Sequence, residues 1–247
     1  RAKDCTKFLK KIYLKHQINK MRKFEQDSLQ KVDGFTAISS DDMQTLNTLA
    51  PDTPGVVSLP MISLPEKRAK KDSNFILIVG NWKWEPNVDG LVWFMNSCWK
   101  TLYIKHPKLK LVIAGPGLSE ELKTSFFTKN VLFPGFVEDL EKLRQQASIF
   151  VSPVFKGSGI RIKILEALAS GSCIVTSKLG VLGLEVDSEK HYLRAENKEE
   201  FIRQIDRILK DDVSTNKISQ NARQYAQKNH SHNQVSKKLE TFLTRFI

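Results

Sequence analysis

From residue 74 onward, short apolar runs alternate with amphipathic stretches in a regular order. Residues 75–79 (FILIV) form a continuous apolar run that ends at Gly80, as expected for a strand buried on both faces. Further strands are predicted at residues 109–114, 131–133, 149–152 and 173–176. Helices are predicted at residues 87–103, 119–126, 138–146 and 160–170, with Pro86 before the first and Gly171 after the last. Strand–helix units of this length predict an α/β fold with a doubly wound parallel sheet.

The pattern before residue 74 is less regular. Apolar residues at helical spacing predict one helix over residues 5–31. A short buried strand is expected at residues 34–39 (GFTAIS), with Ser40 and Asp41 as candidate N-caps of the helix that follows. A second short strand is expected at residues 56–60 (VVSLP).

Positive charge is concentrated at the start of the chain. The net charge is +12 over 247 residues, and residues 1–31 carry ten Lys/Arg and three acidic residues, a net +7. Such a surface suits nucleic acid, anionic lipid or an acidic substrate, and a solvated helix face is the alternative. A basic amphipathic helix also makes peripheral contact with an anionic membrane possible. Residues 65–74 (PEKRAKKDSN) are charged and nearly without apolar residues, which predicts a linker.

Other bulk features exclude several classes of protein. No apolar stretch reaches the roughly 18 residues that a membrane-spanning helix needs, and the first residues lack the apolar core of a secretory signal. They also lack an initiator Met, so we expect a fragment or a processed chain. The three cysteines are widely spaced and the histidines do not cluster with Cys or acids, which argues against disulfides and a metal site. We expect a cytoplasmic protein with reduced thiols.

Glycines follow most of the predicted strands. In a parallel sheet ligands bind at the carboxyl ends of the strands, so these glycines are expected to gather on the ligand-binding edge. They are Gly80, Gly115, Gly117, Gly135, Gly157 and Gly159.

The segment at residues 154–183 carries the most informative chemistry. Glycines around Ser158 remove side-chain bulk just before a predicted helix, where backbone N–H groups and the helix dipole favour an anion. Arg161 and Lys163 add two cations, and Glu166 follows about one turn later, where a carboxylate can accept hydrogen bonds from a ribose diol. This combination suits a nucleoside diphosphate; a tight turn with an ordinary solvated Arg and Lys is the alternative.

Several motifs, in order, resemble one enzyme family. KGSGIRIKILEALASGSCIVTSKLGVLGLE resembles the donor-site motif of family 4 glycosyltransferases, the large retaining group 1 family with the GT-B fold. VGNWKWEPNVDGLVWF, LVIAGPG and LFPGFVEDLEKLRQQASIFVSPV resemble the preceding segments of that donor domain. FEQDSLQKVDGFTAISSDDMQTL is similar to the last strand and helix of the family's N-terminal domain, so the resemblance covers nearly the whole chain.

The resemblance implies a division into four parts. Residues 1–64 would be the incomplete C-terminal part of the acceptor-side Rossmann-like domain, and residues 65–73 a linker. Residues 74–229 would form the Rossmann-like nucleotide-sugar-binding domain, and residues 230–247 a C-terminal helix that packs back across the domain boundary.

The resemblance also assigns site residues. Glu166 matches the second acid of the family's acid–seven residues–acid pair, which binds the donor ribose, whereas the first acid is replaced by Ser158. Asn81 and Trp82 stand where the family has an arginine, so we suggest that Arg161 and Lys163 supply the positive charge against the diphosphate. The catalytic set is therefore Glu166, Arg161 and Lys163. The donor-binding set is Gly80, Asn81, Trp82, Asn87, Gly115, Gly117, Gly135, Phe136, Val137, Gly157, Ser158, Gly159, Ile160 and Leu165, with Phe136 and Val137 beside the base.

Four tryptophans and four histidines receive weaker assignments. Trp93 and Trp99 are expected in the core, whereas Trp82 and Trp84 lie in a loop at the sheet edge and suit either stacking or packing. Surface or capping positions are expected for the histidines, which are His106, His191, His230 and His232.

The implied reaction is transfer of a sugar from a nucleoside diphosphate sugar to a saccharide or lipid-linked acceptor with anomeric retention, in cell-surface polysaccharide or glycolipid synthesis. No metal or other cofactor is expected, because a helix dipole and cations can stabilise the diphosphate. We expect a cytoplasmic location, with possible peripheral contact at the inner membrane face, no nucleic acid partner, and no transfer by this chain alone. A non-catalytic nucleotide-binding module, suggested by Ser158, and a basic nucleic-acid-binding protein are the alternatives.

Overall fold

The computed structural model describes residues 2–65 and 72–246, which form two compact units. The larger unit is Pro60–Val235, and the smaller unit comprises Arg1–Leu59 together with Ser236–Ile247. Most of the predicted linker lies outside the described residues.

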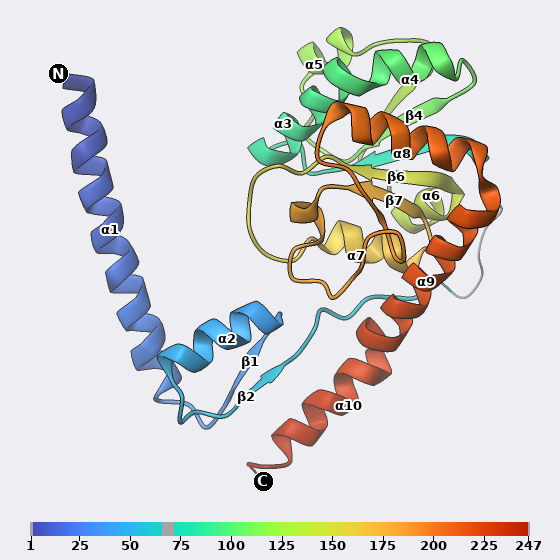
Figure 1. Ribbon diagram of the computed structural model, residues 1–247. Helices are drawn as coiled ribbons and strands as arrows, with labels where there is room; N and C mark the ends of the chain where they lie inside the picture. The colour runs from blue at the N-terminus through green and yellow to red at the C-terminus, as the bar shows by residue number, and fades with distance from the viewer. Residues whose placement is uncertain (1, 66–71, 247) are drawn as a thin grey trace. The chain divides into compact units, whose positions relative to one another are not determined.

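The smaller unit contains the short elements predicted near the start of the chain (Figure 1). Helix α1 (Ala2–Leu29) is followed by strand β1 (Phe35–Ala37), helix α2 (Ser40–Leu49) and strand β2 (Gly55–Val57), and the two strands pair in parallel. The predicted N-cap of α2 is corrected: the Ser39 hydroxyl accepts the hydrogen bond from the Asp42 backbone N–H at 3.1 Å. Ser39 has the extended backbone conformation that a capping residue requires, whereas Ser40 already lies in the helix.

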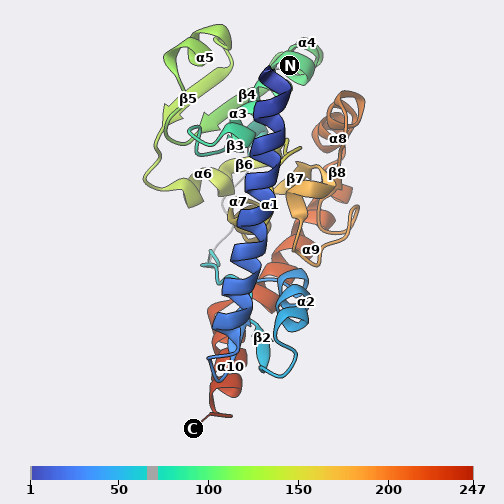
Figure 2. The same cartoon turned by 90° about the vertical axis from the view of Figure 1, so that its left-hand side faces the viewer.

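Helix α1 is one continuous helix, as predicted, and Figure 2 shows its length. Four of its apolar side chains are 51–65% exposed, and they are those of Ile12, Ile18, Met21 and Phe24.

A six-stranded parallel sheet forms the centre of the larger unit. Its strands are β3 (Asp72–Val79), β4 (Lys110–Ala114), β5 (Val131–Gly135), β6 (Ala147–Ser152), β7 (Cys173–Thr176) and β8 (Leu193–Arg194). The strand order is β5-β4-β3-β6-β7-β8, which is the order of a dinucleotide-binding Rossmann sheet. The predicted doubly wound parallel sheet is therefore confirmed.

Helices cover both faces of this sheet (Figure 1). The helical elements of the larger unit are α3 (Glu85–Phe94), the π-helical segment η1 (Met95–Trp99), α4 (Lys100–Lys105), α5 (Glu120–Ser125), α6 (Leu140–Gln146), α7 (Ile162–Ala169), the 3-10 segment η2 (Lys178–Val181), α8 (Lys198–Lys210) and α9 (Asp212–His230). Helix α10 (His232–Leu243) follows α9, and most of its residues belong to the smaller unit. Side chains of α3, η1, α4, α5 and α8 share one buried cluster, and those of α6, α7 and α9 contribute to the other. Strand β8 and helices α8 and α9 were not predicted from the sequence.

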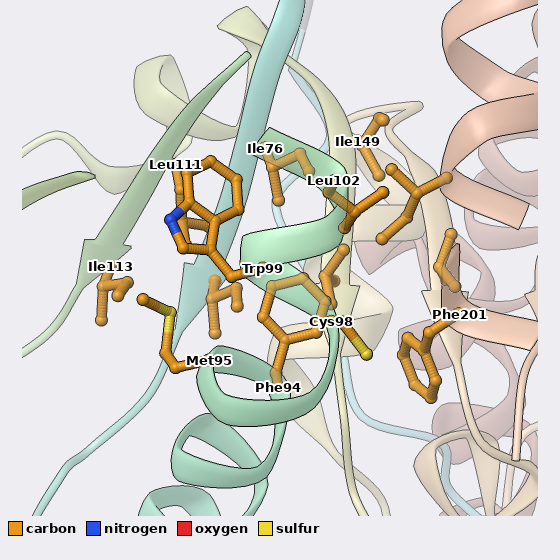
Figure 3. Close-up of a cluster of buried hydrophobic side chains, with 14 of the residues drawn as sticks. Ile76, Phe94, Met95, Cys98, Trp99, Leu102, Leu111, Ile113, Ile149 and Phe201 are labelled. Atoms are coloured by element: carbon orange, nitrogen blue, oxygen red, sulfur yellow. The ribbon is translucent and has the colours of Figure 1, made fainter. Parts of the chain in front are cut away.

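Strand β3 explains why a continuous apolar run is needed at the centre. Ile76 and Ile78 point into the first cluster, whereas Phe75, Leu77 and Val79 point into the second. Figure 3 shows the first cluster, where Trp99 and Leu102 lie with Ile76 and Leu111 of the sheet. Because successive strand residues face opposite sides, a strand covered by helices on both faces must be apolar throughout.

The strand order also determines where a ligand can bind. The chain runs outward from β3 through β4 to β5, and then returns to β6 on the other side of β3. The connections after β3 and β6 therefore lead to helices on opposite faces of the sheet and open a crevice at its carboxyl edge. The segments that follow β3 and β6 are those in which the sequence places the candidate site.

Candidate functional site

The loops after three neighbouring strands are tied together at the carboxyl edge of the sheet. The backbone N–H of Gly80 donates to the Ala114 carbonyl at 3.1 Å, and that of Gly115 donates to the Gly135 carbonyl at 2.7 Å. A Cβ atom on Gly115 would lie 1.8 Å from the Gly80 carbonyl oxygen, and the φ of Gly115 is +120°. The predicted gathering of glycines on one edge is confirmed for Gly80, Gly115 and Gly135, and Gly115 is required by both space and backbone conformation.

Lys163 connects helix α7 to the loop after β3. Its Nζ donates to the Val79 carbonyl at 3.2 Å and to Asn87 Oδ1 at 2.9 Å. The Asn87 side chain in turn donates through Nδ2 to the Asn81 carbonyl at 3.0 Å. Three predicted donor-site residues therefore meet at the end of β3 and the first turn of α3.

The environment of Lys163 is unfavourable for its charge. Burial, together with the positive charge of Arg161, lowers the pKa of Lys163 from 10.5 to about 8. Burial also lowers the pKa of Arg161. Within the described residues, the hydrogen-bond partners of Arg161 and Lys163 are carbonyl and amide oxygens and include no carboxylate. Two unpaired cations close together at the sheet edge provide an electrostatic site for an anion.

The glycine-rich loop precedes α7, but the helix starts later than predicted. The helix was expected to begin at Ile160; it begins at Ile162, and Arg161 occupies the N-cap position. The left-handed conformations of Gly157 (φ +105°) and Gly159 (φ +79°) hold the chain away from helical geometry up to that point. Arg161 Nη1 donates to the Gly159 carbonyl at 3.0 Å, so the arginine folds back over its own loop. Among the described residues, no side chain caps α7, which leaves its first N–H groups available to a ligand.

Glu166 is bound by an arginine that the sequence reasoning missed. Arg144 Nη2 donates to Glu166 Oε2 at 2.5 Å, and Nη1 donates to Glu141 Oε2 at 3.3 Å. Arg144 is only 5% exposed, whereas the Glu166 side chain is 34% exposed. Burial raises the pKa of Glu166, and the charge of Arg144 opposes that shift. The sequence did carry a signal for a buried arginine. Arg144 follows Leu143 directly and Leu140 by four residues, so it shares the face of α6 that packs against the sheet.

The family model described as glycosyl transferases group 1 matches residues 73–211, more than half of the chain. The chain belongs to this family.

Individual relatives of this glycosyltransferase chain are more distant. An uncharacterized 44.6 kDa protein in the cps region of Klebsiella pneumoniae is 25% identical over 244 residues, which cover 94% of this chain and 61% of the relative. A mutant of TarM from S. aureus was solved with Fondaparinux, alpha-GlcNAc-glycerol and UDP. It matches this chain with a TM-score of 0.74 at 13% identity, and the match covers 90% of this chain and 46% of the TarM chain. The pneumococcal O-GlcNAc transferase GtfA, solved with UDP and GlcNAc, has a TM-score of 0.68 at 16% identity, with coverage of 88% and 46%. These likenesses establish the GT-B type of fold, and the chain spans less than two thirds of each of these relatives.

Two predicted donor-binding side chains of the glycosyltransferase are corrected by their burial. Trp82 is 4% exposed and lies in the first apolar cluster, so its ring is not available to stack on a ligand. Leu165 is fully buried in the second cluster and anchors α7 to the sheet. Both residues serve the core because large apolar surfaces at the ends of buried elements are stabilised by packing.

The other predicted residues are accessible to different degrees. Phe136 is 75% exposed, Ser158 and Gly159 are exposed, and Ile160 is half-buried. Val137 packs partly against the second cluster. Gly117 has a φ of +89°, and a Cβ there would meet the Lys83 side chain at 2.8 Å.

Of the two tryptophans expected in the core, Trp99 is buried and Trp93 is partly buried against the first cluster. Trp99 is 3% exposed, and Trp93 forms edge contacts with Phe155 and Phe201 at centroid distances of 4.6 and 5.3 Å. Trp84 is 61% exposed at the start of α3.

Two of the histidines expected at surface or capping positions do not lie at the surface. His230 is fully buried between the Pro60 carbonyl, 3.0 Å from Nδ1, and the Tyr225 hydroxyl, 3.3 Å from Nε2. His191 is 7% exposed, and its Nδ1 accepts from the Asp187 N–H at 2.9 Å. Burial lowers the pKa of both side chains, which favours the neutral imidazole with one donor and one acceptor nitrogen.

Two features are absent from the described ranges. Within residues 2–65 and 72–246, no group of three or more His, Cys, Asp or Glu side chains is arranged to hold a metal ion. Over the same part of the chain, none of the helices combines the length and apolarity needed to cross a membrane.

Proposed function

We propose that this chain carries the donor-binding half of a retaining family 4 glycosyltransferase, which transfers a sugar from a nucleoside diphosphate sugar to a saccharide or lipid-linked acceptor. The observation that carries the proposal is Lys163, whose ammonium crosses from α7 to the end of β3 although its position disfavours the charge. A diphosphate at this edge would satisfy that charge. The TarM and GtfA structures, which share the fold, were both solved with UDP.

Arg161 and Lys163 would hold the diphosphate and stabilise it as the leaving group. Both side chains lie at the N-terminal end of α7, and Lys163 also reaches the first turn of α3 through Asn87. The N-termini of two helices and two cations would then face the same phosphates. Preorganised positive charge stabilises developing negative charge without a metal ion, so we propose metal-independent transfer.

Glu166 would bind the ribose, with the base near Phe136 and Val137. Both oxygens of a carboxylate accept hydrogen bonds, and only Oε2 of Glu166 has a partner among the described residues. Ser158 stands where retaining relatives have an acid at the donor sugar, so we propose that a hydroxyl replaces the charged contact to that sugar.

Proposals about the acceptor and the pathway concern the activity of the whole protein. The chain covers 61% of its relative in the cps region of Klebsiella pneumoniae, and the location of that relative supports the proposal of a role in cell-surface polysaccharide or glycolipid synthesis. We propose that transfer takes place at the cytoplasmic face of the membrane. Contact of the basic helix α1 with anionic lipid stays a prediction, which co-sedimentation with vesicles with and without phosphatidylglycerol would test.

A calorimetric titration separates this proposal from its rivals. UDP, GDP, uridine and a short oligonucleotide would be titrated into the chain at several salt concentrations. We expect one diphosphate to bind and uridine to bind much more weakly, because the two cations recognise phosphate. Strong oligonucleotide binding with a steep salt dependence, and none of either diphosphate, would instead identify a nucleic-acid-binding protein.

A second experiment distinguishes an enzyme from a non-catalytic module. The full-length protein would be incubated with nucleoside diphosphate sugars and an extract of cell-envelope acceptors, and the products analysed by mass spectrometry. The anomeric configuration of the product, determined by NMR, tests retention. Diphosphate binding without turnover of any donor would support the module.

A further inference from the structure

A small cluster of charged residues lies beneath Glu166, between α6 and α7. Arg144 uses one terminal nitrogen for Glu166 Oε2 at 2.5 Å and the other for Glu141 Oε2 at 3.3 Å. The Ser170 hydroxyl donates toward Glu141 Oε1 at 2.9 Å and lies 2.8 Å from the Glu166 carbonyl, and the Ser172 hydroxyl donates to the Arg144 carbonyl at 3.2 Å. The guanidinium is therefore held by one carboxylate from each helix. The turn that follows α7 contacts the Glu141 carboxylate and the Arg144 backbone carbonyl.

Burial differs sharply across this cluster. The Arg144 side chain is 6% exposed, whereas the side chains of Glu166 and Glu141 are 34% and 36% exposed. The cation is thus fixed inside the protein, and the Glu166 carboxylate extends from it toward the surface. A planar guanidinium determines the orientation of the carboxylate that it binds more strictly than a lysine ammonium does.

The two oxygens of Glu166 are not equivalent. Oε2 is occupied by Arg144, and within the described ranges Oε1 has no hydrogen-bond partner. The side chain is also in an environment that opposes its ionisation: burial is the largest influence on its pKa and raises it, and the neighbouring Glu141 raises it further. Arg144 is the cation that counteracts both effects.

We propose that Arg144 is a positioning residue for ribose recognition: it holds Glu166 ionised through Oε2 and directs Oε1 at a ribose hydroxyl. This inference rests on the proposed function, because it assumes that Glu166 meets a nucleotide. An ionised carboxylate accepts a hydroxyl hydrogen bond more strongly than a neutral acid does. Loss of Arg144 would therefore reduce selectivity for the ribose diol more than it reduces phosphate binding.

The test compares ribonucleotides with deoxyribonucleotides. Affinities for UDP, 2′-deoxy-UDP and 3′-deoxy-UDP would be measured from pH 5.5 to 8.5 on the wild type, Arg144→Met, Arg144→Lys, Glu141→Gln and Glu166→Gln, with the GDP series in parallel. The wild type should prefer at least one ribonucleotide by about tenfold or more, as expected for a hydrogen bond to a charged group. Glu166→Gln should reduce that preference.

Arg144→Met should reduce the ribose preference to near one at pH 6 and restore part of it as the pH rises. The reason is that Glu166, without its cation, is protonated up to a higher pH. Arg144→Lys should keep the charge but lose the orientation, so we expect an intermediate preference with a pH profile near that of the wild type. Glu141→Gln removes the charge that Arg144 contacts through its other terminal nitrogen, and this variant should keep the full preference for ribose. A purely structural role of the cluster would instead predict a similar loss of preference in both variants.

Two outcomes overturn different statements. If the wild type prefers ribose through Glu166, but Arg144→Lys and a folded Arg144→Met retain its preference and pH profile, the positioning role is wrong and the proposed function stands. If the wild type binds neither diphosphate, the proposed function fails and this inference fails with it. Should Arg144→Met not fold, Arg144→Lys alone decides, because unchanged ribose selectivity in that variant contradicts the orienting role.

Discussion

Replacement of Lys163 by methionine isolates the charge on which the proposed function depends. The pKa of Lys163 falls from 10.5 in the unfolded chain to about 8 in the fold, which corresponds to a cost of about 3 kcal/mol at roughly 1.4 kcal/mol per pKa unit. Because the folded-state pKa of this base is lowered, the cost is present in full below pH 8 and disappears between pH 8 and 10.5.

Methionine removes this cost but leaves two acceptors without a donor. The Val79 carbonyl and Asn87 Oδ1 lose the Lys163 ammonium, at about 1–3 kcal/mol for each acceptor that stays unsatisfied. The two effects offset each other in large part, so we expect the free energy of unfolding to change by no more than about 3 kcal/mol, measured by urea denaturation at pH 7. Diphosphate binding should instead weaken by about 1.5–3 kcal/mol, roughly 10- to 150-fold, with little change for uridine.

The pH dependence gives an independent readout. Wild-type affinity for the diphosphate should decrease as the pH rises through about 8, because Lys163 loses its proton while the phosphates are already ionised. Lys163→Met should lose this dependence. The exposed Lys142, changed to methionine, is the matched control and should leave both affinity and pH profile unchanged. Equal diphosphate affinity in Lys163→Met and the wild type, or a flat wild-type profile between pH 7 and 9.5, would refute the assignment of Lys163 to the phosphates.

Four further predictions address other parts of the site. Gly115→Ala should destabilise the fold by more than about 3 kcal/mol in urea denaturation, because its Cβ would lie 1.8 Å from the Gly80 oxygen. Gly159→Ala has open space around its Cβ and should cost only about 1–2 kcal/mol of backbone strain. Equal losses of stability in the two variants would contradict this prediction. Glu166→Gln should weaken diphosphate binding by about 1.5–3 kcal/mol, and Glu166→Ala should also lower Tm, because it leaves the buried Arg144 with Glu141 alone. Arg161→Lys should weaken binding if the guanidinium contacts phosphate through two nitrogens, and unchanged calorimetric affinity would count against that geometry. Removal of divalent metal with EDTA should leave diphosphate affinity unchanged, and a loss that Mg²⁺ restores would contradict metal-independent binding.

The sequence by itself determined the elements and the edge on which the site lies. The apolar run at residues 75–79 predicted a strand buried on both faces. The glycines after the strands predicted that the ligand-binding site lies at the carboxyl edge of the sheet. These are local consequences of side-chain size and alternation. The charged cluster of Arg161, Lys163 and Glu166 was also visible, since all three residues lie within one loop and helix.

Contacts between distant segments were decided by the tertiary structure alone. Lys163 meets Val79 across 84 residues of chain, which requires that β6 lies directly beside β3 in the sheet. Trp82 occupies a loop that local pattern leaves equally open to ligand and core, and only the packing of the helical layer places its ring inside. The pairing of Arg144 with Glu166 depends on how α6 and α7 pack together. The two side chains attract each other in any alignment of the helices, but only one alignment brings them into contact. The spacing of Arg144 with Leu140 and Leu143 indicates only that its side chain faces inward. The residue that it meets there is not predictable from a local pattern, because packing between distant segments has no local periodicity.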